Sequence, residues 1–189
     1  MPKTPREKPI KKLSPNKDID ATFKLIIFGE GGVGKTTLTR RYVTGIFTES
    51  TKITIAVDFE MKDLEIDGKT VRLQVWDFAG EKRFRFLLPS YAKGANGGIF
   101  VYDVTNPNSL NQLDEWMEMI QRGGGNVPVL MVGSKIDLIG QRKVYDTEAI
   151  EIAKSHNLSG YAEVSSKTGE NVEEVFQTIT NLMLNKSDI

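Results

Sequence analysis

The chain has 189 residues, 39% of them hydrophobic, which supports one domain of ordinary size rather than two. Lys and Arg together number 25, as do Asp and Glu, so the formal net charge is zero and general binding to nucleic acid is not expected. The absence of Cys excludes disulfides, thiolate metal sites and a Cys nucleophile, and a single His excludes a His-rich metal cage.

Residues 1–21 are predicted to be a flexible basic tail. Four of the seven prolines lie within the first fifteen residues, and the segment carries six basic and three acidic side chains. It lacks the apolar core of a signal peptide, and no apolar run in the chain approaches the ~18 to 20 residues of a membrane span. We therefore expect a cytoplasmic protein. The tail is either a solvated leader without a role or a source of weak attraction to anionic lipid or an acidic partner.

Two patterns predict the strands. Short continuous apolar runs indicate strands covered on both faces at residues 23–28, 98–103, 127–132 and, more weakly, 161–164. Polar and apolar side chains instead alternate along the runs 57–66 and 70–77, which the tight-turn pair Asp67-Gly68 separates. These two runs should form an antiparallel hairpin at one edge of the sheet.

Helices are predicted between the strands from apolar residues at spacings of three and four. One follows the first strand and runs to about Thr44, and two others begin near Leu110 and Val172, with Ser109 and Asn171 as expected caps. The alternation of strands and helices predicts an α/β fold with a mostly parallel sheet, one antiparallel edge strand and helices on both faces. Ligands of such sheets bind at the carboxyl ends of the strands.

The segment of residues 29–36, Gly-Glu-Gly-Gly-Val-Gly-Lys-Thr, follows the first predicted strand and opens a helix. It fits the phosphate-binding pattern G-x-x-x-x-G-K-[ST]. Its backbone N–H groups and the helix N-terminus suit phosphate, Lys35 neutralises the outer phosphates and Thr36 Oγ can ligate Mg²⁺. A Gly-rich turn without a ligand is the alternative, which the strand-then-helix context disfavours. The predicted contacts here are Glu30, Gly31, Gly32, Val33, Gly34, Lys35, Thr36 and Thr37.

Three later segments, each after a predicted strand, indicate which nucleotide binds. In Asp77-Phe-Ala-Gly80, the carboxylate can hold Mg²⁺ and the Gly80 N–H can reach a γ-phosphate. Asp137 can accept two hydrogen bonds from guanine, whereas adenine would leave it unpaired. Backbone N–H groups of Ser165, Ser166 and Lys167 can meet guanine O6. Each segment alone is compatible with a polar loop, but together they predict a site for GTP, GDP and Mg²⁺.

In this order the segments resemble those of the Ras superfamily of small GTPases, most closely the Rab group. The resemblance covers residues 22–184, leaving a short C-terminal tail at 185–189. Residues 47–50 and 54–59 look like the first switch region of Rabs, and residues 76–85 look like the second. The resemblance implies a single P-loop NTPase domain with a six-stranded sheet, and a monomer.

The resemblance also implies roles for individual residues. Phe47 would pack against guanine, Thr54 would join Mg²⁺ and the γ-phosphate only in the triphosphate state, and Lys135 and Lys167 would flank the base. Effectors would read an exposed face made by three aromatic residues, unless these are ordinary core or edge aromatics: Phe59, Trp76 and Tyr91. An exchange factor and a GTPase-activating protein are further expected partners.

Several residues depart from the family pattern. Glu81 stands where the family usually has Gln, which in Ras orients the attacking water. An ionised Glu81 cannot donate a hydrogen bond to the transferring phosphoryl group, and its charge opposes the γ-phosphate, so slow intrinsic hydrolysis is expected. Ser134 replaces the usual Asn, whose carboxamide links residues 134–137, the base loop, to the glycine-rich loop (P-loop), so nucleotide binding is expected to survive but to be weaker. For Arg83 and Arg85, surface or structural roles are favoured over a direct role at the γ-phosphate.

The sequence thus predicts a Mg²⁺-dependent GTP-hydrolysing switch. The predicted metal ligands are Thr36, Thr54 and Asp77, and the predicted catalytic residues are Lys35, Thr54, Gly80 and Glu81. A GTP-loaded binding module with little turnover is the alternative, and a P-loop kinase is disfavoured by Asp137 and by the lack of a lid insertion. Because the chain lacks Cys and has Pro2, the usual prenyl and myristoyl anchors are not expected.

Overall fold

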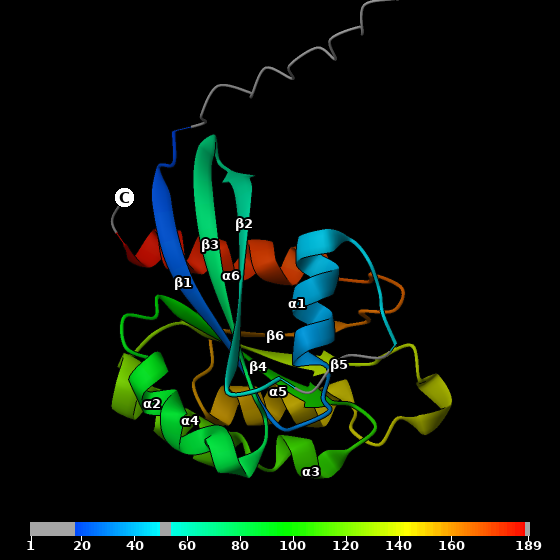
Figure 1. The fold of residues 1–189 in the computed structure, drawn as a ribbon. Coiled ribbons are helices and arrows are strands. Elements are labelled where there is room, and N and C mark those ends of the chain that lie inside the picture. Colours follow the sequence, from blue (N-terminus) through cyan, green and yellow to red (C-terminus); the bar gives the residue numbers. More distant parts are fainter. Residues whose placement is uncertain (1–17, 50–53, 188–189) are drawn as a thin grey trace, which may run out of the picture.

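A six-stranded sheet with strand order β2-β3-β1-β4-β5-β6 forms the centre of the protein (Figure 1). The structure is a computed structural model, which describes residues 18–49 and 54–187. The strands are β1 (Ala21–Phe28), β2 (Val57–Ile66), β3 (Lys69–Phe78), β4 (Gly97–Asp103), β5 (Val129–Ser134) and β6 (Gly160–Val164). All neighbouring strands pair in parallel except β2 and β3, which are antiparallel. The predicted sheet, with its antiparallel edge strand, is confirmed.

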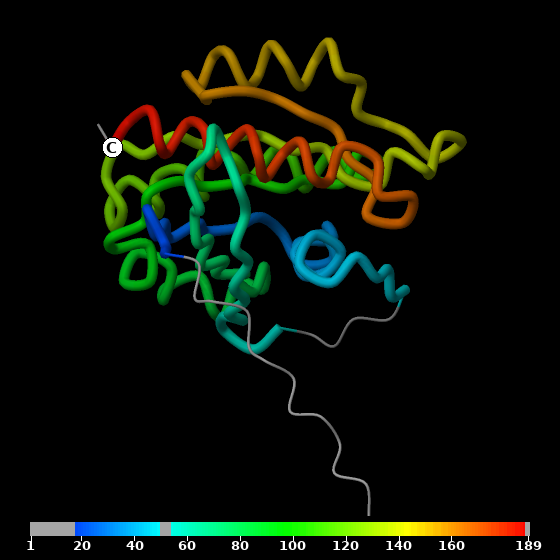
Figure 2. Tube along the Cα trace, turned by 90° about the horizontal axis from the view of Figure 1, so that it is seen from above, coloured from blue at the N-terminus to red at the C-terminus, as the bar shows by residue number. Residues whose placement is uncertain are grey.

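Helices cover both faces of this sheet. The α-helices are α1 (Lys35–Thr44), α2 (Leu88–Tyr91), α3 (Pro107–Leu110), α4 (Leu113–Gly124), α5 (Asp146–Ser155) and α6 (Val172–Lys186), and the 3₁₀ helices are η1 (Lys82–Leu87) and η2 (Ile139–Gln141). Helices α1 and α6 pack on one face, and α2, α4 and α5 pack on the other (Figures 1 and 2). Within residues 18–49 and 54–187, no helix combines the length and apolar character needed to cross a membrane.

Strand β1 explains why the predicted run 23–28 shows no polar alternation. Its Leu25 and Ile27 belong to the core beneath α1 and α6, while Ile26 and Phe28 belong to the core beneath α4. All four are fully buried. Burial of each such side chain stabilises the fold by roughly 1.5–3 kcal/mol, and a strand covered on both faces needs apolar residues at every position.

The α1 and α6 helices meet through an aromatic stack. The rings of Tyr42 and Phe176 lie parallel with their centroids 3.7 Å apart. Figure 2 shows α1, seen almost along its axis, next to α6. This contact fixes the helix that follows the glycine-rich loop against the rest of the core.

The strand boundaries differ in detail from the predicted runs. Strand β1 begins at Ala21 because the Asp20 N–H donates to the Thr70 carbonyl at 2.9 Å and the Thr70 N–H donates to Asp20 Oδ2 at 2.6 Å. Asp20 and Ala21 therefore belong to the domain rather than to the predicted tail. Strand β5 continues to Ser134, which pairs with both β4 and β6. The hairpin turn has positive φ at Asp67 (50°) and Gly68 (77°), as the sequence predicts.

The capping prediction for Ser109 is wrong. The apolar pattern that begins at Leu110 spans two helices, α3 and α4, and Ser109 lies inside α3. Asn106 caps α3 by accepting a hydrogen bond from the Asn108 N–H at 3.2 Å. Asn171 does precede α6, but its side chain donates to the Glu163 carbonyl at 2.8 Å instead of capping the helix.

Candidate functional site

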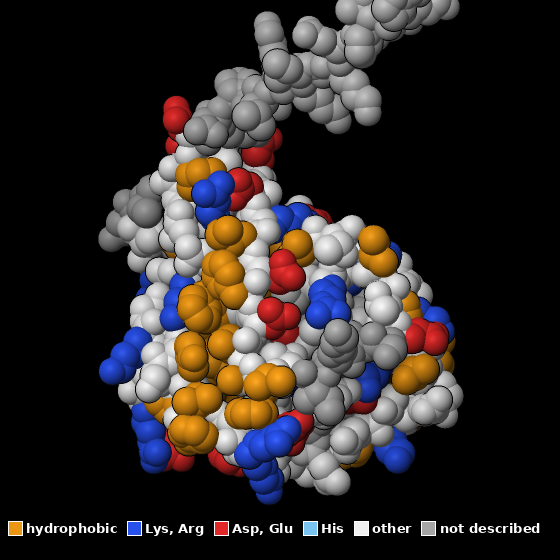
Figure 3. Space-filling view, viewed as in Figure 1, with side chains coloured by type: hydrophobic (Ala, Val, Ile, Leu, Met, Phe, Trp, Pro, Cys, Tyr) orange, Lys and Arg blue, Asp and Glu red, His pale blue; other side chains and the backbone are white. Residues whose placement is uncertain are grey.

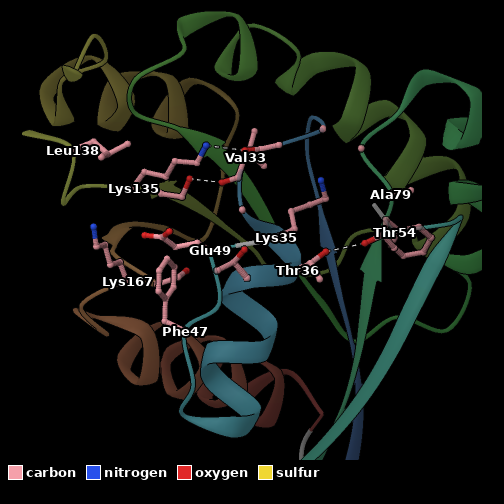
Figure 4. A pocket seen from close by; sticks show the side chains of 18 of the residues that line it. Val33, Lys35, Thr36, Phe47, Glu49, Thr54, Ala79, Lys135, Leu138 and Lys167 are labelled. Carbon is pink, nitrogen blue, oxygen red and sulfur yellow. Dashed lines mark hydrogen bonds between the residues drawn. The ribbon is translucent and has the colours of Figure 1, made fainter. Parts of the chain in front are cut away.

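A cleft of about 620 Å³ lies at the carboxyl ends of β1, β3, β5 and β6 (Figure 4). This volume is in the range of sites for nucleotide-sized ligands. The predicted site residues that line it are Gly31, Gly32, Val33, Gly34, Lys35, Thr36, Thr37, Phe47, Thr54, Gly80, Glu81, Ser134, Lys135, Asp137, Ser166 and Lys167. The three predicted residues that do not line it, Glu30, Asp77 and Ser165, each contact a residue that does.

The loop between β1 and α1 holds a buried cation. Gly34 precedes α1 with φ of 100°, a conformation that favours glycine. Lys35 is only 5% exposed, and its Nζ donates to the carbonyls of Gly29 at 2.9 Å and Glu30 at 2.7 Å. Burial lowers the pKa of Lys35 to about 8, although the nearby carboxylates of Asp77 and Glu30 act in the opposite direction. An anionic phosphate in the cleft would stabilise this desolvated ammonium group.

Oxygen ligands converge beside this lysine. Thr36 Oγ lies 2.8 Å from Thr54 Oγ, as Figure 4 shows, and donates a hydrogen bond to Asp77 Oδ2. Asp77 is 1% exposed, and its Oδ1 has no hydrogen-bond partner among the described residues. Burial raises the pKa of Asp77 to about 6, while the Thr36 hydrogen bond and the Lys35 charge lower it.

This oxygen set fits Mg²⁺. The ion prefers oxygen ligands and usually takes one or two protein groups together with phosphate oxygens and water. A buried carboxylate oxygen without a partner is unusual, and a cation near Asp77 would satisfy it. The described residues contain no cluster of three or more His, Cys, Asp or Glu side chains that would hold a metal ion without such help.

The opposite end of the cleft is built around Asp137. Ser165, which is fully buried, donates its Oγ hydrogen to Asp137 Oδ1 at 2.7 Å and so fixes the carboxylate. Lys135 has φ of 67°, and its Nζ donates to the Gly32 carbonyl at 2.8 Å and pairs with Asp103 at 2.6 Å. Phe47 lines the same end of the cleft (Figure 4). This end therefore combines a fixed carboxylate with aromatic and aliphatic surfaces that suit a planar base.

Ser134 keeps the base loop attached to the P-loop. Its Oγ is buried and lies 2.6 Å from the Val33 carbonyl and 2.8 Å from the Tyr102 carbonyl. A hydroxyl has one hydrogen to donate, and either carbonyl can accept it. The usual carboxamide is absent, but the short Ser134 side chain still reaches the P-loop backbone.

The segment after β3 lies directly against the P-loop. A Cβ atom added to Gly80 would sit 2.2 Å from the carbonyl carbon of Glu30 and from the backbone nitrogen of Gly31. Glu81 follows at the edge of the cleft, where its Oε2 pairs with Arg83 Nε at 2.6 Å. Arg83 is exposed, whereas Arg85 is buried and forms ion pairs.

Three aromatic side chains form one face beside this segment. The ring centroids of Phe59 and Trp76 lie 5.2 Å apart, and those of Trp76 and Tyr91 lie 6.0 Å apart. Phe59 remains 42% exposed, and Met61 extends the apolar surface along β2. Figure 3 shows a band of hydrophobic side chains over the hairpin and the helices below it. The aromatic face is therefore continuous and partly open to solvent.

Sequence reasoning did not place four residues that line the cleft. Glu49, Phe78, Ala79 and Leu138 all border it. Phe78 and Ala79 lie between the predicted site residues Asp77 and Gly80. This position in the sequence could have indicated that they border the cleft. Glu49 lies in the predicted first switch region, although it was not singled out there, whereas Leu138 lies in a loop whose course the periodicity of the sequence does not indicate.

Comparison with known proteins agrees with this geometry. The model of the Ras family matches residues 24–185. The Ras-related protein Rab-1 of Theileria annulata is 42% identical over 172 residues, which cover 90% of this chain and 78% of that protein. The Ras-related protein Rab-1 of Theileria parva shows the same identity and coverage.

Proposed function

Because the chain belongs to the Ras family, as a Rab-like small GTPase that binds GTP and acts as a switch, we propose that it requires Mg²⁺ and hydrolyses GTP slowly without a partner. The observation that carries this proposal is the single cleft that joins the P-loop, Thr54, Gly80 and Asp137. These residues come from the ends of separate strands and loops. Their convergence supports recognition of both ends of one nucleotide.

We assign the base to the Asp137 end of the cleft. The carboxylate would accept hydrogen bonds from guanine N1–H and the 2-amino group, with Ser165 holding it in place. Phe47 and the aliphatic stems of Lys135 and Lys167 would enclose the base, and the backbone of Ser166 would meet O6. Adenine would leave the Asp137 carboxylate desolvated and without donors, which disfavours ATP.

We assign the phosphates to the P-loop end. The N–H groups of residues 30–37 and the Lys35 ammonium group would bind the β- and γ-phosphates. Thr36 Oγ, Thr54 Oγ and the Asp77 carboxylate, directly or through water, would hold Mg²⁺. When bound, Mg²⁺ supplies positive charge to phosphate oxygens on which negative charge develops during hydrolysis.

Thr54 and Gly80 would report the presence of the γ-phosphate. Both lie in the segments that flank the β2–β3 hairpin, and the hairpin carries Phe59 and Trp76. Loss of the γ-phosphate would release these segments and change the aromatic face. We propose that effectors read this face in the triphosphate state, and that an exchange factor and a GTPase-activating protein set the cycle.

The position of Glu81 supports slow hydrolysis. Its carboxylate lies at the cleft edge and is held in an ion pair with Arg83. A carboxylate offers no hydrogen to the transferring phosphoryl group, and the ion pair competes with a water molecule for its oxygens. The same observation favours the second candidate function, a GTP-loaded binding module with little turnover.

Replacing Glu81 with Gln should raise the rate of phosphate release in a single turnover by roughly tenfold to a hundredfold. The amide removes the opposing charge and restores a donor near the γ-phosphate. The surface variant Glu118→Gln, which removes a carboxylate from the exposed pair with Arg122, should leave the rate unchanged. A lower rate in Glu81→Gln than in the unmodified protein would show that the carboxylate itself assists hydrolysis.

Replacing Ser134 with Ala should accelerate GDP dissociation about tenfold. The change leaves a buried carbonyl without its donor and removes one of the hydrogen bonds that join the base loop to the P-loop, while the bond from Lys135 Nζ to the Gly32 carbonyl remains. The dissociation of a fluorescent GDP derivative measures this effect, and the exposed Ser155→Ala serves as the matched control. Equal dissociation rates for Ser134→Ala and the unmodified protein would contradict the proposed link.

The cellular setting is also a proposal. We place the protein in the cytoplasm as a monomer, with a switch domain that begins at Asp20 and ends near residue 184. Weak attraction to membranes through the basic tail depends on residues 1–21, of which residues 1–17 lie outside the described part of the chain.

A further inference from the structure

A buried arginine joins three segments that lie far apart in the sequence. Arg85, in η1, is 5% exposed. Its Nη2 bonds to Glu30 Oε1 in the P-loop, and its Nη1 donates to Glu115 Oε2 in α4 at 2.6 Å. Its guanidinium lies 4.8 Å from the centroid of the Trp116 ring, which is fully buried. A buried guanidinium requires such partners, because an unpaired charge there would be costly.

This cluster provides a second attachment between residues 80–85 and the P-loop. The first attachment is the backbone of Gly80, which lies directly on Glu30 and Gly31. The two attachments lie five residues apart in the chain, and both end on the P-loop. Glu81 lies between them, so its position relative to the phosphate end of the cleft depends on both.

The partners of Arg85 differ in exposure. The Glu30 side chain is 24% exposed, whereas the Glu115 side chain is 52% exposed. The ion pair of Arg85 with Glu30 is therefore less screened by water than the pair with Glu115, and it contributes more to holding Arg85 in place. The charges of this pair also act on the buried Lys35: the Glu30 carboxylate raises the pKa of Lys35, and the Arg85 guanidinium lowers it. The cluster thus borders the phosphate-binding lysine as well as η1.

We propose that Arg85 is a positioning residue for the γ-phosphate: it holds residues 80–85 on the P-loop through Glu30, so that Gly80 and Glu81 are in place when a triphosphate binds. The inference rests on the proposed function, because it assumes that Gly80 contacts the γ-phosphate. A diphosphate makes no such contact. Arg85 should therefore affect the affinity for triphosphate more than that for diphosphate.

The test compares the dissociation rates of GDP and of a non-hydrolysable GTP analogue, both measured with Mg²⁺. The variant Arg85→Met removes the charge but keeps an apolar chain over Trp116. We expect the analogue to dissociate about tenfold faster and GDP to dissociate less than about twofold faster. The matched control is Arg122→Met, which breaks the exposed pair with Glu118 on α4 and should change neither rate.

A double-mutant cycle assigns the effect to the pair. Glu30→Gln should also accelerate dissociation of the analogue more than that of GDP. The double variant, Glu30→Gln with Arg85→Met, should release the analogue no faster than Arg85→Met alone. If Arg85→Met does not fold, the comparison of the two dissociation rates is made with Glu30→Gln alone. This variant should fold, because the Glu30 side chain is partly exposed and Gln has nearly the same shape as Glu.

Three results would overturn the proposal. The first is equal acceleration of GDP and analogue dissociation, which would indicate a general loss of structure. The second is additivity of the effects of Glu30→Gln and Arg85→Met. The third is an unchanged dissociation rate of the analogue. Failure of the proposed hydrolysis would appear separately, as absent phosphate release from the unmodified protein. The analogue comparison does not depend on hydrolysis.

Discussion

Replacing Asp137 with Asn is expected to weaken GTP binding roughly a thousandfold. Two hydrogen bonds to a charged acceptor contribute about 1.5–3 kcal/mol each, and every 1.4 kcal/mol is a factor of ten. Asn has one oxygen and one NH₂ group in place of two carboxylate oxygens. One of the two acceptors for guanine is therefore lost, and the Asn NH₂ group, itself a donor, faces a donor of guanine. Ser165 would also lose its charged partner.

Equilibrium titration with GTP and ATP measures this effect. The unmodified protein should prefer GTP strongly, and Asp137→Asn should lose most of that preference without gaining affinity for ATP. The exposed Asp146→Asn, in the first turn of α5, is the matched control. An Asp137→Asn variant that still separates GTP from ATP as well as the unmodified protein would show that another group reads the base.

Replacing Lys35 with Met is the second change with a large expected effect. GTP affinity should fall roughly a hundredfold or more, because a desolvated ammonium group and its charge-assisted hydrogen bonds to phosphate are lost. Lys35 is assigned to the outer phosphates, so GMP affinity should change little. The loss should therefore increase from GMP to GDP to GTP.

Calorimetric titration with GMP, GDP and GTP tests this order. Lys154→Met, on the exposed side of α5, removes a lysine that does not line the cleft and should leave all three affinities unchanged. A uniform loss for the three nucleotides would instead mean that Lys35 supports the fold of the loop through the Gly29 and Glu30 carbonyls.

The parts of the fold that the sequence predicts are those with a strong local signal. The buried strand β1 shows an uninterrupted apolar run, the hairpin turn needs Asp67-Gly68 at positive φ, and the P-loop needs glycine at position 34. Each of these features depends on a few neighbouring residues. Their physical requirements can therefore be read from the chain without its tertiary contacts.

The parts that the sequence did not predict depend on distant partners. The Ser134 hydroxyl reaches Val33, a residue 101 positions away, and Arg85 meets Glu30 across 55 positions. The break between α3 and α4 falls inside one apolar pattern, since both helices bury residues on the same face of the sheet. Periodicity shows that a face is apolar but does not show where the backbone turns along it.

A Rab-like chain with Glu81 in place of Gln can still act as a switch. Base recognition, phosphate binding and the proposed Mg²⁺ ligands lie in parts of the cleft that do not involve Glu81. Only the hydrolytic step would depend on the hydrogen bonds that this side chain offers. A slow step would lengthen the triphosphate state, and an external activator would then control its lifetime.

Phosphate release in a single turnover shows directly whether the protein is a slow, Mg²⁺-dependent GTPase. The measurement uses the purified full chain, loaded with GTP in the presence of Mg²⁺. We predict slow first-order release that exceeds uncatalysed hydrolysis and is lost when the metal is removed with a chelator. Tight GTP binding with no release above the uncatalysed rate would contradict it, and would favour the GTP-loaded binding module.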